Sequence, residues 1–127
     1  MGIRTELQLR LPNSPGALAG VCELLAGERV NIIAMSLDAG GQFRLIVDNP
    51  TKAGGVLRDQ HHRVTERDVI VLSVAGGPGA LAPVLKIVSD AGVNLNYAYG
   101  AAAEGSASAA VVIGVDDAQR AAAATGT

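Results

Sequence analysis

The sequence predicts an α+β fold made of two tandem copies of one βαββαβ unit. The copies appear as repeats: Pro15-Gly16-Ala17-Leu18-Ala19 recurs as Pro78-Gly79-Ala80-Leu81-Ala82, and Val30-Asn31-Ile32 recurs as Val93-Asn94-Leu95. Both repeats have the same offset of 63 residues (78 − 15 and 93 − 30). Two separated matches in one register indicate a duplication, and the hydrophobic pattern inside each copy then predicts its elements.

The first copy carries the pattern of every element in turn. Leucines alternate over residues 6–11, which predicts a strand with one apolar face. Ser14 suits a helix N-cap and Pro15 the first helical position, so we expect the first helix to begin there. Its buried stripe has the spacing i, i+3, i+4, i+7 and consists of Leu18, Val21, Cys22 and Leu25. The remaining elements are expected as a strand from residue 30, a strand over 43–47, a helix over 50–59 and a strand over 63–72.

The second copy repeats this order with two departures. About five extra residues fall in the loop 101–108, and the sequence stops after the helix over 118–124, which leaves no eighth strand. A βαββαβ unit of the ferredoxin-like kind forms an antiparallel sheet with strand order 4-1-3-2 and both helices on one face, so the missing strand is an edge strand. We expect a partner chain or the other copy to cover the edge left open. The two domains are expected to span residues 1–67 and 68–127.

Composition restricts the class of protein. Of 127 residues, 49% are hydrophobic and 17% charged, which is typical of a folded globular chain. A net charge of −2 and 2% aromatic residues argue against nucleic acid as a partner. No apolar run reaches the roughly 18 residues of a membrane helix, which argues against a membrane. One cysteine and no signal peptide at the start favour a cytoplasmic location.

The Pro-Gly motif followed by the Val-Asn-Ile run resembles the ACT domain, a sensor of small ligands in amino-acid metabolism. The match extends over almost the whole chain, twice, and looks most like stand-alone tandem ACT proteins. The resemblance implies a non-catalytic, allosteric regulatory module, as a homodimer, that needs no cofactor. It also implies a free amino acid as ligand, held where the loop after the first strand of one domain meets the second strand of a neighbouring domain.

The resemblance places candidate ligand contacts in both copies. A carboxylate suits the N–H groups at a helix start, and an ammonium suits amide oxygens such as those of Asn13 and Asn31. In serine-sensing relatives asparagines occupy these two positions. Gly76 and Gly77 replace Asn13 and Ser14 in the second copy, so the first loop is expected to be the better site. The expected contacts are Asn13, Ser14, Pro15, Gly16, Ala17, Leu18, Asn31 and Ile32, with Gly77, Gly79, Ala80, Asn94, Leu95 and Asn96 in the second copy.

Some of these residues have equally good structural explanations. Asn31 and Asn94 also suit the passage from a helix to a strand, where an amide satisfies backbone groups. Cys22 belongs to a buried stripe, so no nucleophile is expected there. His61 and His62 are expected in a solvated loop or at the start of a strand; being adjacent, they would point to opposite faces of a strand, and no metal site is expected. Asp116 and Asp117 are expected to cap a helix.

A second functional hypothesis needs no ligand. In that hypothesis the chain is a structural or regulatory subunit that pairs with an amino-acid biosynthetic enzyme, and the open sheet edge is the surface that favours it.

Overall fold

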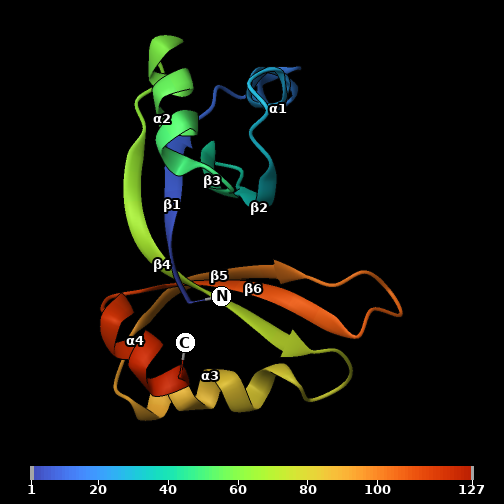
Figure 1. Cartoon of the computed structure of the whole chain (residues 1–127), viewed down its shortest axis with the longest axis vertical. Helices are drawn as coiled ribbons and strands as arrows, with labels where there is room; N and C mark the ends of the chain where they lie inside the picture. Colours follow the sequence, from blue (N-terminus) through green and yellow to red (C-terminus); the bar gives the residue numbers. More distant parts are fainter. Residues whose placement is uncertain (1, 127) are drawn as a thin grey trace. The chain divides into compact units, whose positions relative to one another are not determined.

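The computed structural model describes residues 2–126, which form two compact units. The N-terminal unit contains residues 5–67, and the C-terminal unit contains residues 2–4 and 68–126. Figure 1 labels the elements, and their order confirms the α+β class and the repeated βαββαβ pattern. They are β1 (Gly2–Arg10), α1 (Ala17–Gly27), β2 (Ile32–Leu37), β3 (Gln42–Val47), α2 (Pro50–Asp59), β4 (Thr65–Ala75), α3 (Leu81–Asp90), β5 (Leu95–Ala101), β6 (Ser108–Val115) and α4 (Ala118–Thr125).

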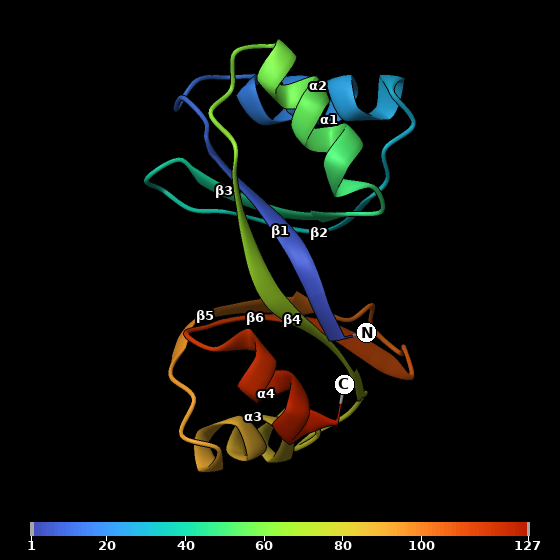
Figure 2. The same cartoon turned by 60° about the vertical axis from the view of Figure 1, so that its left-hand side comes forward.

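The N-terminal unit has the strand order β2-β3-β1-β4. Strand β3 is antiparallel to both β1 and β2, and the pairing sets Leu7 opposite Leu45 and Leu9 opposite Phe43. Helices α1 and α2 lie on the same face of these strands (Figure 2). The apolar residues of the alternating strands therefore face the helices and form one core, which consists of Leu7, Leu9, Leu11, Val21, Leu25, Val30, Phe43, Leu45, Val47, Ala53 and Leu57.

The C-terminal unit repeats this arrangement with the strand order β1-β4-β6-β5. Strands β4 and β6 are antiparallel, with Ile70 opposite Ile113 and Leu72 opposite Val111. Helices α3 and α4 cover one face (Figure 2). The core between these helices and the strands consists of Ile70, Leu72, Val74, Val88, Val93, Val111, Ile113, Val115, Ala121 and Ala122.

The edge of the C-terminal unit beside β4 is occupied by β1. Residues 2–4 of β1 belong to this unit, β1 is hydrogen-bonded to β4, and Ile3 packs against the C-terminal core. The strand that covers the edge is thus continuous with the first strand of the other copy. This is the second of the two alternatives expected from the sequence.

The expected start of the first helix at Ser14-Pro15 is wrong. Helix α1 begins at Ala17, and its N-cap is Gly16 with a φ of +84°, in the left-handed region. A left-handed residue cannot be part of a right-handed helix, so the helix starts after it. Ser14 contributes its carbonyl, which accepts the Ala17 N–H at 3.3 Å. The expected cap at the last helix is confirmed for Asp117, whose side chain accepts the Arg120 N–H at 3.0 Å.

The first helix of each copy is followed by a residue in the left-handed conformation. After α3 this residue is Gly92, with a φ of +73°, and at the equivalent position after α1 it is Arg29, with a φ of +60°. The next N–H bonds back into the helix in both copies: Val30 to the Leu25 carbonyl at 2.9 Å and Val93 to the Val88 carbonyl at 3.3 Å. Because a side chain is disfavoured at positive φ, Arg29 is strained where Gly92 is not.

Replacing Arg29 with glycine is therefore expected to stabilise the protein. Relief of the left-handed strain outweighs the greater freedom of the unfolded chain, for a net gain of about 0.5–1 kcal/mol in the free energy of unfolding. Urea denaturation of Arg29→Gly measures the gain. The neighbouring variant Glu28→Gly is the control: Glu28 has a φ of −97°, so glycine there should reduce stability by about 0.5–1 kcal/mol. Loss of stability in both variants would contradict the explanation.

Shortening Ile3 should weaken the C-terminal unit. Ile3 is half-buried against that core, so Ile3→Ala is expected to cost about 1–2 kcal/mol, roughly half the loss at a fully buried isoleucine. Hydrogen exchange of the β6 amides should accelerate more than that of the β3 amides. The exposed Ile33 provides the control, since Ile33→Ala should change stability by no more than about 0.5 kcal/mol. Equal acceleration in β3 and β6 would argue against this role of residues 2–4.

Candidate functional site

The first candidate site is a cavity at the end of β1 in the N-terminal unit, which we call the N-terminal cavity. Its volume is about 740 Å³, and three segments enclose it: the loop after β1, the first turns of α1 and the turn between β2 and β3. The size falls within the range usual for small-molecule sites. It is lined by Leu11, Pro12, Asn13, Ser14, Gly16, Ala17, Leu18, Ala19, Cys22, Leu37, Asp38, Ala39 and Gly41.

A close backbone contact joins the loop after β1 to the β2–β3 turn. The Leu11 N–H donates to the Gly41 carbonyl at 2.8 Å. Gly41 has a φ of +86°, and a Cβ on it would stand 2.5 Å from the Leu11 carbonyl oxygen. Only glycine fits at this position without a shift of the backbone, so the Gly40-Gly41 turn is what brings the two sides of the cavity together.

Asp38 organises the turn on the cavity's rim. Its Oδ1 accepts the Gly40 N–H at 2.9 Å and the Gln42 N–H at 3.0 Å, while its Oδ2 lies 4.0 Å from Nη1 of Arg44. Arg10 adds a bond from its guanidinium to the Gly40 carbonyl. The cavity thus combines one carboxylate with the amide of Asn13 and the hydroxyl of Ser14, and its inner wall includes the half-buried Cys22.

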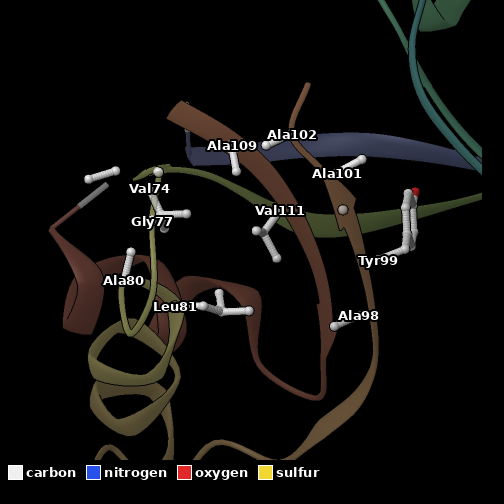
Figure 3. Close-up of a pocket in the computed structure, with 13 residues that line it drawn as sticks. Val74, Gly77, Ala80, Leu81, Ala98, Tyr99, Ala101, Ala102, Ala109 and Val111 are labelled. Carbon is white, nitrogen blue, oxygen red and sulfur yellow. The ribbon is translucent and has the colours of Figure 1, made fainter. Parts of the chain in front are cut away.

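The C-terminal unit has a cavity in the equivalent place, which we call the C-terminal cavity (Figure 3). Its volume is about 410 Å³. The repeat offset of 63 relates it to the first: Gly76 and Gly77 stand where Asn13 and Ser14 stand in the first copy, and Ala101 stands where Asp38 does. It is lined by Val74, Ala75, Gly76, Gly77, Ala80, Leu81, Ala98, Tyr99, Gly100, Ala101, Ala102, Ala109 and Val111.

Asn31 and Ile32 lie outside the N-terminal cavity. They are at the start of β2, whereas the cavity borders Leu37 at the end of the same strand. The backbone of Asn31 is paired with Asp48: the Asn31 N–H donates to Asp48 Oδ1 at 3.0 Å, and the Asp48 N–H donates to the Asn31 carbonyl at 3.1 Å. These bonds account for the backbone of Asn31, and the role of its side chain stays a prediction.

The second copy separates its candidate residues in the same way. Asn94 and Leu95 line a different hollow of about 440 Å³ beside the end of α3. The Asp116 N–H donates to the Asn94 carbonyl at 3.1 Å, and Nδ2 of Asn96 donates to Asp116 Oδ1 at 3.0 Å. Of the candidates in this copy, Gly77 and Ala80 line the C-terminal cavity, while Gly79 lies between them in the chain.

Sequence reasoning identified the loops but missed the opposite walls. In the N-terminal cavity these are Leu37, Asp38 and Gly41, and in the C-terminal cavity residues 98–102 with Ala109 and Val111. The strand order expected from the sequence could have indicated these walls. Antiparallel pairing of β1 with β3 brings the β2–β3 turn beside the end of β1, and the repeat offset of 63 predicts the same arrangement in the second copy.

Two further properties of the described chain bear on its chemistry. Across residues 2–126, no three side chains of His, Cys, Asp or Glu gather closely enough to hold a metal ion. The helices found in that same range are too short or too polar to cross a membrane.

Comparisons with known proteins agree with the fold. A family model described as an ACT domain pair matches residues 1–124. A protein from Bacteroides thetaiotaomicron of known structure is 34% identical, with a TM-score of 0.87 over 96% of this chain and 85% of its own. The regulatory subunit of aspartate kinase from Thermus thermophilus, in its ligand-free form, is 21% identical with a TM-score of 0.72, covering 99% of this chain and 95% of its own. The corresponding subunit from Thermus flavus is 20% identical with a TM-score of 0.65, over 99% and 95%. No curated protein matches the sequence.

Removing the carboxylate of Asp38 should loosen the turn that borders the N-terminal cavity. Asp38→Ala deletes the acceptor of two N–H groups, and because the side chain is half-exposed the expected loss is about 1 kcal/mol. Urea denaturation measures the loss, and the amides of Gly40 and Gln42 should exchange faster. In the control Asp59→Ala the carboxylate removed is at the end of α2, where it opposes the helix dipole, so stability should stay equal or rise. Unchanged exchange at Gly40 would contradict the role given to Asp38.

Proposed function

The chain belongs to the ACT domain pair family, and we propose that it is a non-catalytic regulatory module that binds a free amino acid in its N-terminal cavity. The observation that carries the proposal is the grouping of Asn13, Ser14 and Asp38 around one cavity of small-molecule size at the start of α1. The sequence motif and the cavity thus point to the same loop.

The chemistry of an amino acid fits these groups. Its carboxylate can accept hydrogen bonds from the first N–H groups of α1, whose helix dipole favours a negative charge, and from the Ser14 hydroxyl. Its ammonium can donate to the amide oxygen of Asn13 and to the carboxylate of Asp38. The Leu18 and Leu37 side chains on the cavity wall leave an apolar surface for the rest of the ligand.

We further propose that a second copy of the chain completes the site. Asn31 is at the other end of β2 from the cavity of its own unit, so a contact between Asn31 and a ligand held by Asn13 requires a neighbouring unit. A homodimer would supply it, with Asn94 and Asn96 in the corresponding place of the C-terminal unit. We also propose that the chain consists of two ACT domains, over residues 1–67 and 68–127. The proposed location is the cytoplasm.

Two of the similar structures are regulatory subunits of aspartate kinase, which supports a role for this chain beside an enzyme of amino-acid biosynthesis. A ligand would act by favouring one conformation or assembly state, and the difference in its affinity for the two states limits the effect to a coupling of typically ~1–3 kcal/mol.

A second candidate function follows from strand β2, which is at an edge of the sheet. It exposes Ile33, Met35 and Leu37 by 41–47%, a row of large apolar side chains that is unusual for a free surface. In this alternative the chain is a subunit that docks on an enzyme without binding a ligand. Affinity purification from the native cell separates the two: a stoichiometric enzyme with no amino-acid response supports docking alone.

Thermal denaturation in the presence of each of the twenty amino acids tests ligand binding. An amino acid present at ~100 times its Kd should add roughly 2.7 kcal/mol to the free energy of unfolding and raise the Tm accordingly. The variant Asn13→Ala should bind that amino acid about tenfold more weakly or worse, because a hydrogen bond to a charged group is lost.

The matched control removes an amide elsewhere. Gln119→Ala replaces an exposed amide on α4 with a good helix former, so both stability and ligand affinity should be retained. No increase in Tm with any of the amino acids would refute the proposed binding, and equal affinity in Asn13→Ala would remove the N-terminal cavity as its place.

A further inference from the structure

The outermost strands of the sheet, β2 and β5, each have one edge with no other strand of residues 2–126 beside it. The N–H and C=O groups along such an edge can hydrogen-bond to a strand of another chain. Large apolar side chains are exposed by 39–47% beside both edges: Ile33, Met35 and Leu37 on β2, Leu95 on β5 and Leu81 at the start of α3. Apolar residues gathered at an open strand edge indicate an interface between chains.

The two edges differ in the size of their side chains. At the repeat offset of 63, bulky residues of β2 correspond to smaller ones of β5: Ile33 to Asn96, Met35 to Ala98 and Leu37 to Gly100. The C-terminal cavity lies along this part of β5, and Figure 3 shows Leu81 and Val111 directed into it. A β5 edge beside another β5 edge would leave this space empty, whereas a β2 edge has side chains large enough to fill it.

Helix α1 directs one charged residue toward the β2 edge. Ala19, Cys22, Glu23 and Ala26 have the spacing i, i+3, i+4, i+7 and therefore share one face of the helix. Ala19 and Cys22 line the N-terminal cavity together with Leu37 of β2, so this face is on the side of the edge strand. Glu23 is exposed and carries the only charge of the four.

Helix α3 has the opposite charge at the equivalent position. The corresponding face consists of Ala82, Leu85, Lys86 and Ser89, and two of these residues, Leu85 and Ser89, line a hollow together with Leu95 of β5. Lys86 is 75% exposed, and its Nζ lies 3.1 Å from Oδ2 of Asp90. An exposed pair at i, i+4 in which the lysine precedes the acid is weak, so the ammonium can also bind a carboxylate of another chain.

These charges select which units pair. Equivalent units that join edge to edge, with their helices on the same face, are related by a local two-fold axis, so their first helices run antiparallel and meet at their middles. Glu23 is in the middle of α1 and Lys86 in the middle of α3. A second α1 beside α1 would set two glutamates together, and a second α3 beside α3 would set two lysines together. Only α1 beside the α3 of another chain brings opposite charges into contact.

We propose that the N-terminal unit of one copy pairs, through β2 and α1, with the C-terminal unit of a second copy, through β5 and α3. This inference rests on the proposed function for the role of the N-terminal cavity and deepens it by naming the unit that completes the cavity. In an antiparallel pair the end of β2 lies opposite the start of β5. The amide brought to the cavity is therefore that of Asn94, the equivalent of Asn31 in the C-terminal unit.

Charge reversal tests the choice of partner. Glu23→Lys and Lys86→Glu each exchange one good helix former for another at an exposed position, so folding should be retained. Analytical ultracentrifugation of the full chain at low salt measures the dissociation constant. Each single variant should associate about tenfold more weakly, because like charges then meet, and the double variant should regain the affinity of the natural chain. Added salt should reduce these differences.

The matched control makes the same change of charge elsewhere. Asp59→Lys is at the end of α2, outside both edge strands and their neighbouring helices, and should associate like the natural chain. If equal edges paired instead, Glu23→Lys would only exchange two glutamates for two lysines. Unchanged association of both single variants would therefore overturn the inference. A chain that stays monomeric at every concentration would overturn it too, and would leave the β2 edge to an enzyme partner.

Cross-linking gives a second measurement that does not depend on charge. Two full-length chains, both with Cys22→Ala, carry Met35→Cys in one and Ala98→Cys in the other, at exposed positions in the middle of β2 and of β5. A short bismaleimide added to an equal mixture should join the two different chains in preference to two identical ones. Products that consist mainly of identical chains would overturn the proposed pairing.

The pairing and the proposed function can fail separately. Association that follows the charge reversals, without a response to any of the twenty amino acids, would support the pairing and refute ligand binding. An increase in Tm with an amino acid, in single variants whose association is unchanged, would leave the proposed function standing and overturn the pairing.

Discussion

The fold depends on a single strand pair, β1 with β4. Residues 5–10 of β1 belong to the N-terminal unit and residues 2–4 to the C-terminal one, and β4 likewise passes from the first unit to the second at residues 67 and 68. Each unit therefore obtains its four-stranded sheet by sharing two long strands. The first repeat contains all the strands of the N-terminal unit, residues 5–67, whereas the second repeat needs residues 2–4 of β1 to complete its sheet, so the duplication seen in the sequence does not coincide with the compact units of the structure.

Equivalent backbones can carry unequal chemistry, and the cavities illustrate how little has to change. The geometry beside each cavity is set by backbone: the Leu11–Gly41 bond follows β1 in the N-terminal unit, and the Gly76–Ala107 bond follows β4 in the C-terminal unit. The side chains determine only which chemical groups line each cavity. Exchange of an amide, a hydroxyl and a carboxylate for hydrogen or methyl converts a polar cavity into an apolar one without altering the elements that enclose it.

The sequence predicts the fold well because its signals are local. Alternating leucines in β1, the stripe of α1 and the Asn49-Pro50 start of α2 each depend on residues within one element. The start of α1 was misplaced because Ser14 and Pro15 satisfy the usual cap pattern, while the left-handed Gly16 between them and the helix overrides it. The cavity loops were predictable from motifs. Asp38 and residues 98–102 were not, since only the pairing of distant strands brings them beside those loops.

Sharing β1 also governs the order in which the protein can fold. Residues 2–4, which complete the C-terminal sheet, are synthesised before their partners in β4, which follow more than sixty residues later. Contacts of such long sequence separation close large loops and form slowly. During synthesis the N-terminal unit can assemble once β4 begins to emerge, while residues 2–4 remain a strand end with unpaired backbone groups until the rest of β4 arrives. The C-terminal unit therefore cannot complete its sheet without residues 2–4, which are synthesised before all of its other strands.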